Sequence, residues 1–258
     1  MDKFVRQLGY IEALVRANLR AHHAEIRRLI TMSCVMFVQN LMFFTMWIVF
    51  FGSIRQVKGW QLGDVGLMFG TIATACGLAL LTADGVRTIA MKIQDGSIDG
   101  YLTRPRHALP ALLLSRSNSA SLGDILTGPV YWFVFGGASL SQLPIMICLT
   151  LLSATVFLSA LVVFYSLAFW LQRGGRFSDQ LFEVLIIFSS IPQHAQSLGT
   201  KVVMFSILPA GFISLVPASL MHHFNFEQFT LLVGAAALYA CIALCFFNAG
   251  VRRYITGI

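Results

Sequence analysis

The feature that most constrains this chain is a series of long apolar runs, interrupted by a strongly polar segment at 86–107. Of its 258 residues, 57% are hydrophobic and only 11% are charged, and the mean hydropathy is +0.76. Soluble domains carry about 25% charged residues, whereas about 20 consecutive apolar residues are enough to cross a bilayer. The sequence therefore predicts an all-α integral membrane protein that forms a single domain over 1–258.

The apolar runs and their polar boundaries predict six transmembrane helices. An amphipathic, arginine-rich segment at 2–28 precedes them and is expected to lie in the headgroup plane as an interfacial helix. The apolar run within 193–227 contains two prolines and a glycine, which argue against one uninterrupted helix. We therefore expect 193–227 to form an extracytoplasmic re-entrant helical hairpin. The predicted spans are 30–51, 65–82, 119–140, 144–172, 177–191 and 229–249.

The distribution of basic residues predicts the orientation. Fifteen of the 18 Lys and Arg residues lie in the N-terminal arm, at 84–118, at 172–179 and at the C-terminus, whereas Arg55, Lys58 and Lys201 lie on the other side. Cytoplasmic loops carry such an excess, so both termini are expected to be cytoplasmic. The formal net charge of +7 does not indicate nucleic-acid binding, because no basic stripe alternates with exposed aromatic residues.

The polar segment has a helical pattern of its own. Apolar residues recur at Val86, Ile89 and Ile93 and again from Ile98, and the Asp95-Gly96 pair interrupts the pattern between them. Charges at mid-bilayer cost roughly 2.5–3.5 kcal/mol each on insertion scales, so this segment should lie outside the membrane. Two short amphipathic helices around a glycine turn would form a docking surface for a soluble partner.

The run from 93 to 105, IQDGSIDGYLTRP, resembles the signature G-x-(I/L)-D-x-x-L-x-R-P of ABC-2 type transporter permeases. Further similarities follow in order at Phe169-Trp170, Pro192, Leu208-Pro209 and 216–218, with Ile191 in place of an aromatic residue. The resemblance implies a permease subunit of an ATP-driven exporter in the cytoplasmic (inner) membrane of a bacterium. It implies as partners ABC ATPase subunits, which would hold ATP and Mg, and a second permease subunit, identical or homologous.

By this resemblance, the loop at 84–118 would contain coupling helices that contact the ATPase. Its apolar side chains would pack against that partner, while Asp95 and Asp99 would meet basic residues of the ATPase or cap the helices. The residues implied in ATPase coupling are Ile93, Asp95, Gly96, Ile98, Asp99, Tyr101, Leu102, Arg104 and Pro105.

Several residues inside the predicted spans are candidates for helix contacts or for the translocation path. Gln39 and Asn40 should face neighbouring helices or a wet cavity, because an amide is costly in lipid. Small residues in two spans, at 66, 70, 73 and 77 and at 234, 237, 241 and 245, would let other helices approach closely. Gly128-Pro129 should kink or loosen its helix. The residues assigned to the path and gate are Asn40, Phe44, Phe69, Phe188, Pro192, Pro209 and Pro217, and phenylalanine-rich inward faces predict a hydrophobic or amphipathic cargo.

Alternatively, the chain could be a membrane-embedded enzyme acting on lipid head groups, because Asp84, Asp95, Asp99 and Asp124 all lie near the predicted inner face. The sequence has no G-x-x-x-x-G-K-[ST] loop to bind ATP phosphates and no G-x-S-x-G motif for a serine nucleophile. Its two histidine pairs are adjacent in sequence and lack the i, i+4 spacing of a metal site. We therefore expect no cofactor, metal or catalytic residue in this chain.

Overall fold

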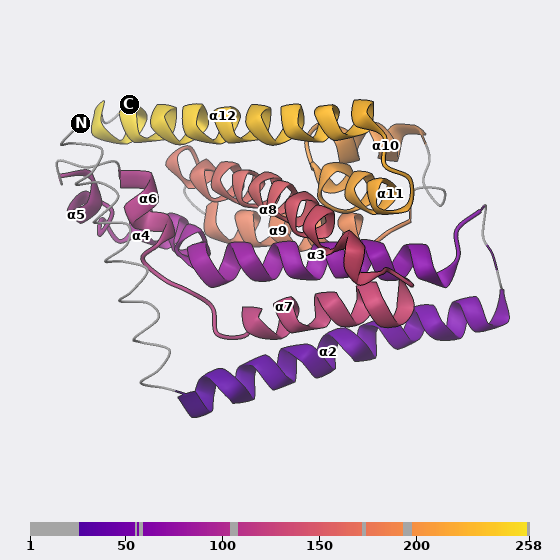
Figure 1. The fold of residues 1–258 in the computed structure, drawn as a ribbon. Helices are drawn as coiled ribbons and strands as arrows, with labels where there is room; N and C mark the ends of the chain where they lie inside the picture. The colour runs from indigo at the N-terminus through magenta and orange to yellow at the C-terminus, as the bar shows by residue number, and fades with distance from the viewer. Residues whose placement is uncertain are drawn as a thin grey trace.

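The computed structural model describes residues 26–54, 56, 59–103, 108–171, 174–192 and 198–256, and this part of the chain is helical without strands. The predicted interfacial helix at 2–28 therefore lies almost wholly outside the described residues. The longer helices run roughly alongside one another as a bundle (Figure 1). Those helices are α2 (Ile26–Ser53), α3 (Leu62–Ala83), α7 (Ser121–Val130), α8 (Leu143–Ser166), α9 (Gly174–Ser189) and α12 (Phe226–Thr256).

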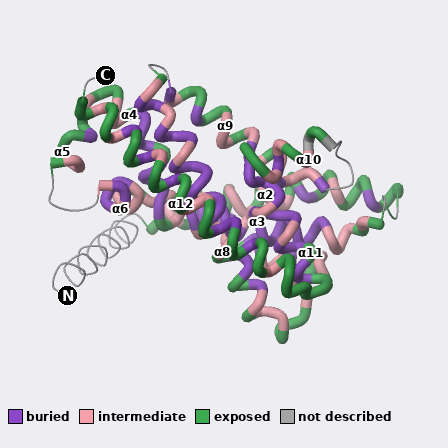
Figure 2. The backbone as a smooth tube through the Cα atoms, turned by 90° about the horizontal axis from the view of Figure 1, so that it is seen from above, coloured by how far each residue is buried: buried purple, intermediate pink, exposed green. Residues whose placement is uncertain are grey.

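Helix α3 is the centre of the bundle. It packs against α7 on one side and α8 on the other; α2 covers α7, and α12 covers α8. Its apolar window is 78% buried, against 11% for α2 and 17% for α12, so α2 and α12 present most of their apolar surface to the outside. Figure 2 shows this contrast along the chain. The exposed apolar faces of the outer helices are the surface expected to meet lipid.

The small residues of α3 bring it close to α7. A Cβ atom added at Gly77 would lie 2.8 Å from the backbone oxygen of Ser121, and one at Gly70 would lie 2.9 Å from that of Gly128. On the opposite side of α7, a Cβ atom at Gly123 would overlap the backbone of α2. The predicted role of the small-residue stripe in α3 is confirmed. The similar stripe in α12 is different, because Gly234 has open space around it.

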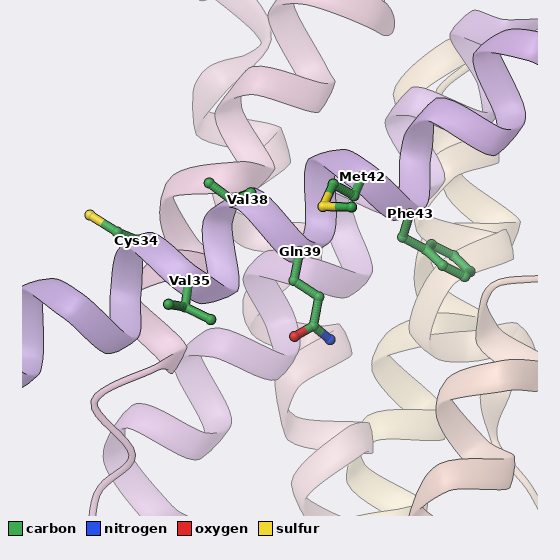
Figure 3. Close-up of a pocket in the computed structure, with 6 residues that line it drawn as sticks. All are labelled: Cys34, Val35, Val38, Gln39, Met42 and Phe43. Atoms are coloured by element: carbon green, nitrogen blue, oxygen red, sulfur yellow. The ribbon is translucent and has the colours of Figure 1, made fainter.

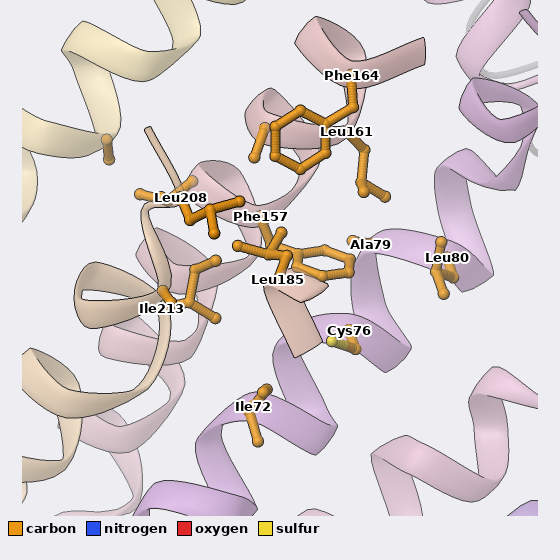
Figure 4. Close-up of a cluster of buried hydrophobic side chains, with 14 of the residues drawn as sticks. Ile72, Cys76, Ala79, Leu80, Phe157, Leu161, Phe164, Leu185, Leu208 and Ile213 are labelled. Carbon is orange, nitrogen blue, oxygen red and sulfur yellow. The ribbon is translucent and has the colours of Figure 1, made fainter. Parts of the chain in front are cut away.

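A second layer of the core forms between α3, α8 and α9. Figure 4 shows side chains of this cluster, among them Ile72 and Cys76 from α3, Phe157 and Leu161 from α8, and Leu185 from α9 beside Phe157. Phe157, Leu161 and Leu185 have no exposed surface. This layer joins the first half of the chain to the second.

Four of the six predicted spans are long and apolar enough to cross a membrane. They correspond to Ile26–Ser53, Leu62–Gln94, Leu140–Phe169 and Phe226–Thr256. The third predicted span is α7 followed directly by η2 (Tyr131–Phe135), where the helix widens to π geometry just after Pro129, as the proline suggested. The fifth is α9, whose 16 residues extend about 24 Å, less than the roughly 30 Å hydrocarbon core. The count of six spans therefore stays a prediction.

The predicted hairpin contains two helical parts. These are α10 (Leu198–Phe205) and the continuous pair η6 (Gly211–Leu215) and α11 (Val216–His222), and Pro209 lies in the break between them. Residues 193–197 lie outside the described part. Pro217 follows the π-helical turn η6 inside this continuous stretch, where its missing N–H interrupts a backbone hydrogen bond. The structure supports two short helices, and their depth in a membrane stays a prediction.

Candidate functional site

The polar segment folds into a compact projection at one end of the bundle. It consists of η1 (Asp84–Thr88), α4 (Ile89–Gln94), a turn at 95–98 and α5 (Asp99–Leu102), and α6 (Ala108–Leu113) follows it. We call residues 89–103 the elbow. The elbow and the C-terminal end of α12 lie at the same end of the bundle, and α10 and α11 lie at the other (Figure 1). The predicted pair of short helices around a glycine turn is therefore confirmed.

Local hydrogen bonds fix the turn of the elbow. Oδ1 of Asp95 accepts hydrogen bonds from the backbone nitrogen of Ser97 at 2.9 Å and from its hydroxyl at 2.7 Å. These bonds stabilise the carboxylate, so the pKa of Asp95 is lowered, chiefly by the Ser97 side chain. Gly96 has φ of 75°, a left-handed conformation that favours glycine. The Asp95 side chain thus closes the turn, whereas α5 has no side-chain cap hydrogen bond. The Asp95 side chain stays exposed, and its contact with basic residues of an ATPase stays a prediction.

The apolar residues of the elbow point mainly inward. Ile98 has no exposed surface, so in this conformation it anchors the turn and offers no surface to an ATPase. Ile93, Tyr101 and Leu102 are partly buried against the core. The exposed face of the elbow consists of Met91, Gln94, Asp95, Ser97, Asp99, Gly100 and Thr103. Arg104 and Pro105 lie outside the described residues, and the assignment of all these residues to ATPase coupling stays a prediction.

Lys92 connects the two arms of this projection. Its Nζ donates hydrogen bonds to the Tyr101 hydroxyl at 3.1 Å and to Oγ of Ser115 at 2.9 Å, and it lies 4.5 Å from the centroid of the Tyr101 ring. α4, α5 and the segment after α6 are thus tied by one cation. The elbow is consequently held as a unit against the adjacent end of the bundle.

A buried carboxylate lies at the base of the elbow. The Asp84 side chain is only 2% exposed, and its Oδ2 lies 2.9 Å from Nε of Arg116. Arg87 lies farther away, 3.7 Å from Oδ1, and the backbone nitrogen of Gly85 donates to the Arg116 oxygen at 3.1 Å. A buried charge is tolerated when it is paired in this way. The contacts join the end of α3 to the segment that returns toward α7.

Arg87 connects the group around Asp84 to α8 and α9. Its guanidinium carbon lies 5.2 Å from the centroid of the Phe182 ring in α9, and it also interacts with the hydroxyl of Tyr165 in α8. That hydroxyl donates a hydrogen bond of 2.6 Å to Oδ1 of Asp179. Sequence reasoning missed this cluster, because its members come from three separate helix ends. The available signal was that Arg87, Tyr165 and Asp179 each lie at the polar boundary of an apolar run.

The residues predicted for the translocation path lie in different parts of the bundle. Phe44 and Phe69 are buried in an aromatic cluster, where the Phe44 ring centroid lies 4.6 Å from that of Tyr131 and 5.7 Å from that of Phe69. Phe188 is partly buried and packs on the core near the end of α9. Pro192, Pro209 and Pro217 are buried around the hairpin. Their roles in a path or gate stay predictions.

Asn40 bonds α2 to α7. Its Nδ2 donates to Oδ1 of Asp124 at 2.8 Å, and its backbone oxygen accepts from the hydroxyl of Tyr131 at 2.6 Å. The expectation that the amide of Asn40 faces a neighbouring helix is thus confirmed.

The neighbouring amide, Gln39, lies on the outer face of α2. An open hollow of about 680 Å³ lies along this face, and Figure 3 shows its lining, with Gln39 among apolar side chains. The lining residues are Cys34, Val35, Val38, Gln39, Met42 and Phe43. Gln39 is the polar side chain among these lining residues.

The enzyme alternative receives no support from this arrangement. Among the described residues, no group of three or more His, Cys, Asp or Glu side chains is placed to hold a metal ion. Asp84 is engaged by arginines, and Asp124 by an asparagine. Asp95 accepts hydrogen bonds from Ser97, and Asp99 interacts with the hydroxyl of Tyr254 in α12, so the four aspartates proposed for such a site have separate local partners.

The described part of the chain is helical, with four helices long and apolar enough to span a membrane and a folded polar projection at one end, as in a multi-pass membrane protein. The family model described as ABC-2 family transporter protein matches residues 36–257. The chain belongs to this family, and it is a membrane permease component of an ABC transporter. No curated protein and no solved structure matches the chain.

Proposed function

We propose that the chain forms half of the translocation path of an ATP-driven exporter and that a separate ATPase drives it through the elbow. The observation that supports this most is the folded elbow, which presents Asp95 and Asp99 on its exposed face at one end of the bundle. ATP and Mg would bind to the ATPase partner. Bound ATP must then favour one permease conformation over another. A ligand shifts a conformational equilibrium only by the difference between its affinities for the two conformations.

The contacts of α4 suggest how movement would pass into the bundle. α4 packs against η4 (Leu167–Phe169), α8 and α9, and Arg87 just before it lies over Phe182 of α9. Displacement of the elbow by the ATPase would therefore tilt α3 and α9 together. The hairpin at the far end of the same bundle would act as the outer gate.

A second permease subunit would complete the path at the outer face of α2. Gln39 is exposed there, and the structure records no hydrogen bond to it from the described part of the chain. An amide exposed to hydrocarbon is costly, so a protein surface or a cargo group would stabilise it. The apolar lining of the hollow favours a hydrophobic or amphipathic cargo. Stimulation of ATPase activity in nanodiscs by hydrophilic ions alone would argue against that cargo class.

The membrane orientation is part of the same proposal. The elbow and the end of α12 lie at one end of the bundle (Figure 1), and both belong to the arginine- and lysine-rich side. This end would face the cytoplasm of a bacterium, across the inner membrane. Labelling of a cysteine introduced at Ser97 from outside intact cells would contradict the orientation.

The decisive experiment is purification of the tagged chain from its native membrane, followed by identification of subunits that carry an ATP-binding Walker A sequence. Asp95→Asn then tests the elbow, because asparagine can still accept the hydrogen bonds from Ser97 but has no charge. We expect ATPase affinity to fall about two- to five-fold, the value of one exposed ion pair. Glu227→Gln, at the other end of the bundle, should leave affinity unchanged. Absence of any such ATPase from the purified complex would refute the proposal.

A further inference from the structure

An ion pair fastens the second helical part of the hairpin to the start of α3. Nε2 of His222, the last residue of α11, contacts Oδ1 of Asp64 in the first turn of α3. The side chains are 43% and 21% exposed, so both remain accessible to water and protons. The pair lies at the end of the bundle opposite the elbow (Figure 1). Sequence reasoning excluded a metal site at His222 but did not identify Asp64 as its partner.

The Asp64 carboxylate is held in place by its own helix. Its Oδ2 accepts a hydrogen bond of 2.7 Å from the backbone nitrogen of Gln61, as part of a capping box at the start of α3. A carboxylate in the first turn of a 22-residue helix is also favoured by the helix dipole. The Asp64 side chain is therefore fixed in position, in contact with His222.

The surroundings leave His222 as the group whose charge decides the strength of this contact. α11 packs against α3, α8, α12 and η6, and α8 and η6 contain no charged residue. The titratable groups that remain nearby are His223, whose ring centroid lies 6.4 Å from that of His222, and Glu227 in the first turn of α12. In the described part of the chain, the ion pair recorded for His222 is with Asp64.

We propose that the Asp64–His222 pair is a pH-sensitive clasp that holds α11 on α3. Histidine is the side chain that ordinarily changes charge between pH 5 and 8. In acid, the imidazolium makes a charge-assisted contact with the carboxylate, which is stronger than the neutral one. The stabilisation is therefore present at low pH and is lost as the pH rises and the imidazole loses its proton. A second contact, from Nε2 of Gln142 to the Met221 oxygen at 3.4 Å, does not depend on pH and keeps α11 in place.

The clasp gives the hairpin a sensor that is independent of the elbow. Closure at this end would be favoured in an acidic compartment and relaxed near neutrality, whatever occupies the elbow. The inference rests on geometry at one end of the bundle, so it does not require that an ATPase binds the other.

Hydrogen–deuterium exchange of the full chain in lipid nanodiscs tests the clasp. The exchange rate of peptides covering 216–223 is measured at pH 5.5 and at pH 8, and each rate is divided by the intrinsic exchange rate at that pH. A peptide from the middle of α8 serves as the reference that should not respond to pH. We expect exchange at 216–223 to be about two- to five-fold slower at pH 5.5, as for a partly exposed ion pair. His222→Gln should abolish this pH difference.

His223→Gln is the matched control, because it removes the adjacent histidine and leaves the Asp64 contact. The pH difference should survive in this variant. The clasp is refuted if the unmodified chain exchanges equally at both pH values, or if His222→Gln keeps the difference. It is also refuted if His223→Gln is the variant that loses it.

Discussion

Gly77 lies in the seam between α3 and α7, and its replacement by alanine tests whether close helix approach sets the stability of this bundle. A Cβ atom there would lie 2.7 Å from Cγ1 of Ile125, 2.8 Å from the oxygen of Ser121 and 2.9 Å from the nitrogen of Ile125. Two of these three atoms belong to the backbone of α7 and cannot rotate away. The helices must therefore separate to accept the methyl group.

The size of the effect follows from comparison with Gly234→Ala in α12. Alanine favours helix over glycine by about 1 kcal/mol at either position, so this contribution cancels between the two variants. Gly234 has no atom within 4 Å of the added Cβ, whereas overpacking of a closely packed site costs about 1–3 kcal/mol. The free energies of unfolding of the two variants should differ by that amount, about 5- to 150-fold in the equilibrium constant.

Reversible unfolding in mixed micelles, with increasing fractions of SDS, measures this difference. Fluorescence of the four tryptophans reports tertiary packing, and circular dichroism confirms that each variant begins with the same helix content. Gly77→Ala should unfold at a lower SDS fraction than the unmodified chain, and Gly234→Ala at an equal or higher one. Equal unfolding midpoints for the two variants would refute the argument that the seam depends on the missing side chain.

Two further substitutions test a buried hydrogen bond and the turn of the elbow. Asn40→Leu removes the donor to Asp124 and should destabilise the chain by about 1–3 kcal/mol, measured by the same SDS titration. Gln39→Leu on the outer face should lower the free energy of unfolding by less. Equal losses in the two variants would contradict the placement of Asn40 against α7 and of Gln39 on the outer face. Gly96→Ala should cost about 1–2 kcal/mol, because φ of 75° forces alanine into a left-handed conformation. The Gly96→Ala variant should be cleaved faster in the elbow by a protease in nanodiscs. Gly100→Ala is the control and should not be cleaved faster, because a Cβ atom at Gly100 has nothing within 4 Å. Equal cleavage rates for the two variants would exclude backbone strain at Gly96 as the cause.

The sequence by itself determined the features that depend on neighbours along the chain. The apolar runs predicted the four long helices, because length and composition alone decide whether a helix can span a bilayer. The Asp95-Gly96 pair predicted the turn of the elbow, since a short acceptor side chain and a residue tolerant of positive φ are what that turn requires. The spacing of Gly66, Gly70 and Gly77 likewise predicted close packing by α3.

Only the tertiary structure decided which partners these faces meet. Asn40 and Asp124 are 84 positions apart, and nothing in either local pattern specifies the other. The same holds for His222 with Asp64 and for Arg87 with Phe182. Ile98 shows the limit most clearly, because an apolar residue in a polar loop can face a partner or the interior, and packing of the elbow directs it inward. The physical reason is that a periodic pattern specifies which face of a helix is apolar, whereas the helix that covers this face is selected by the fit of the whole bundle.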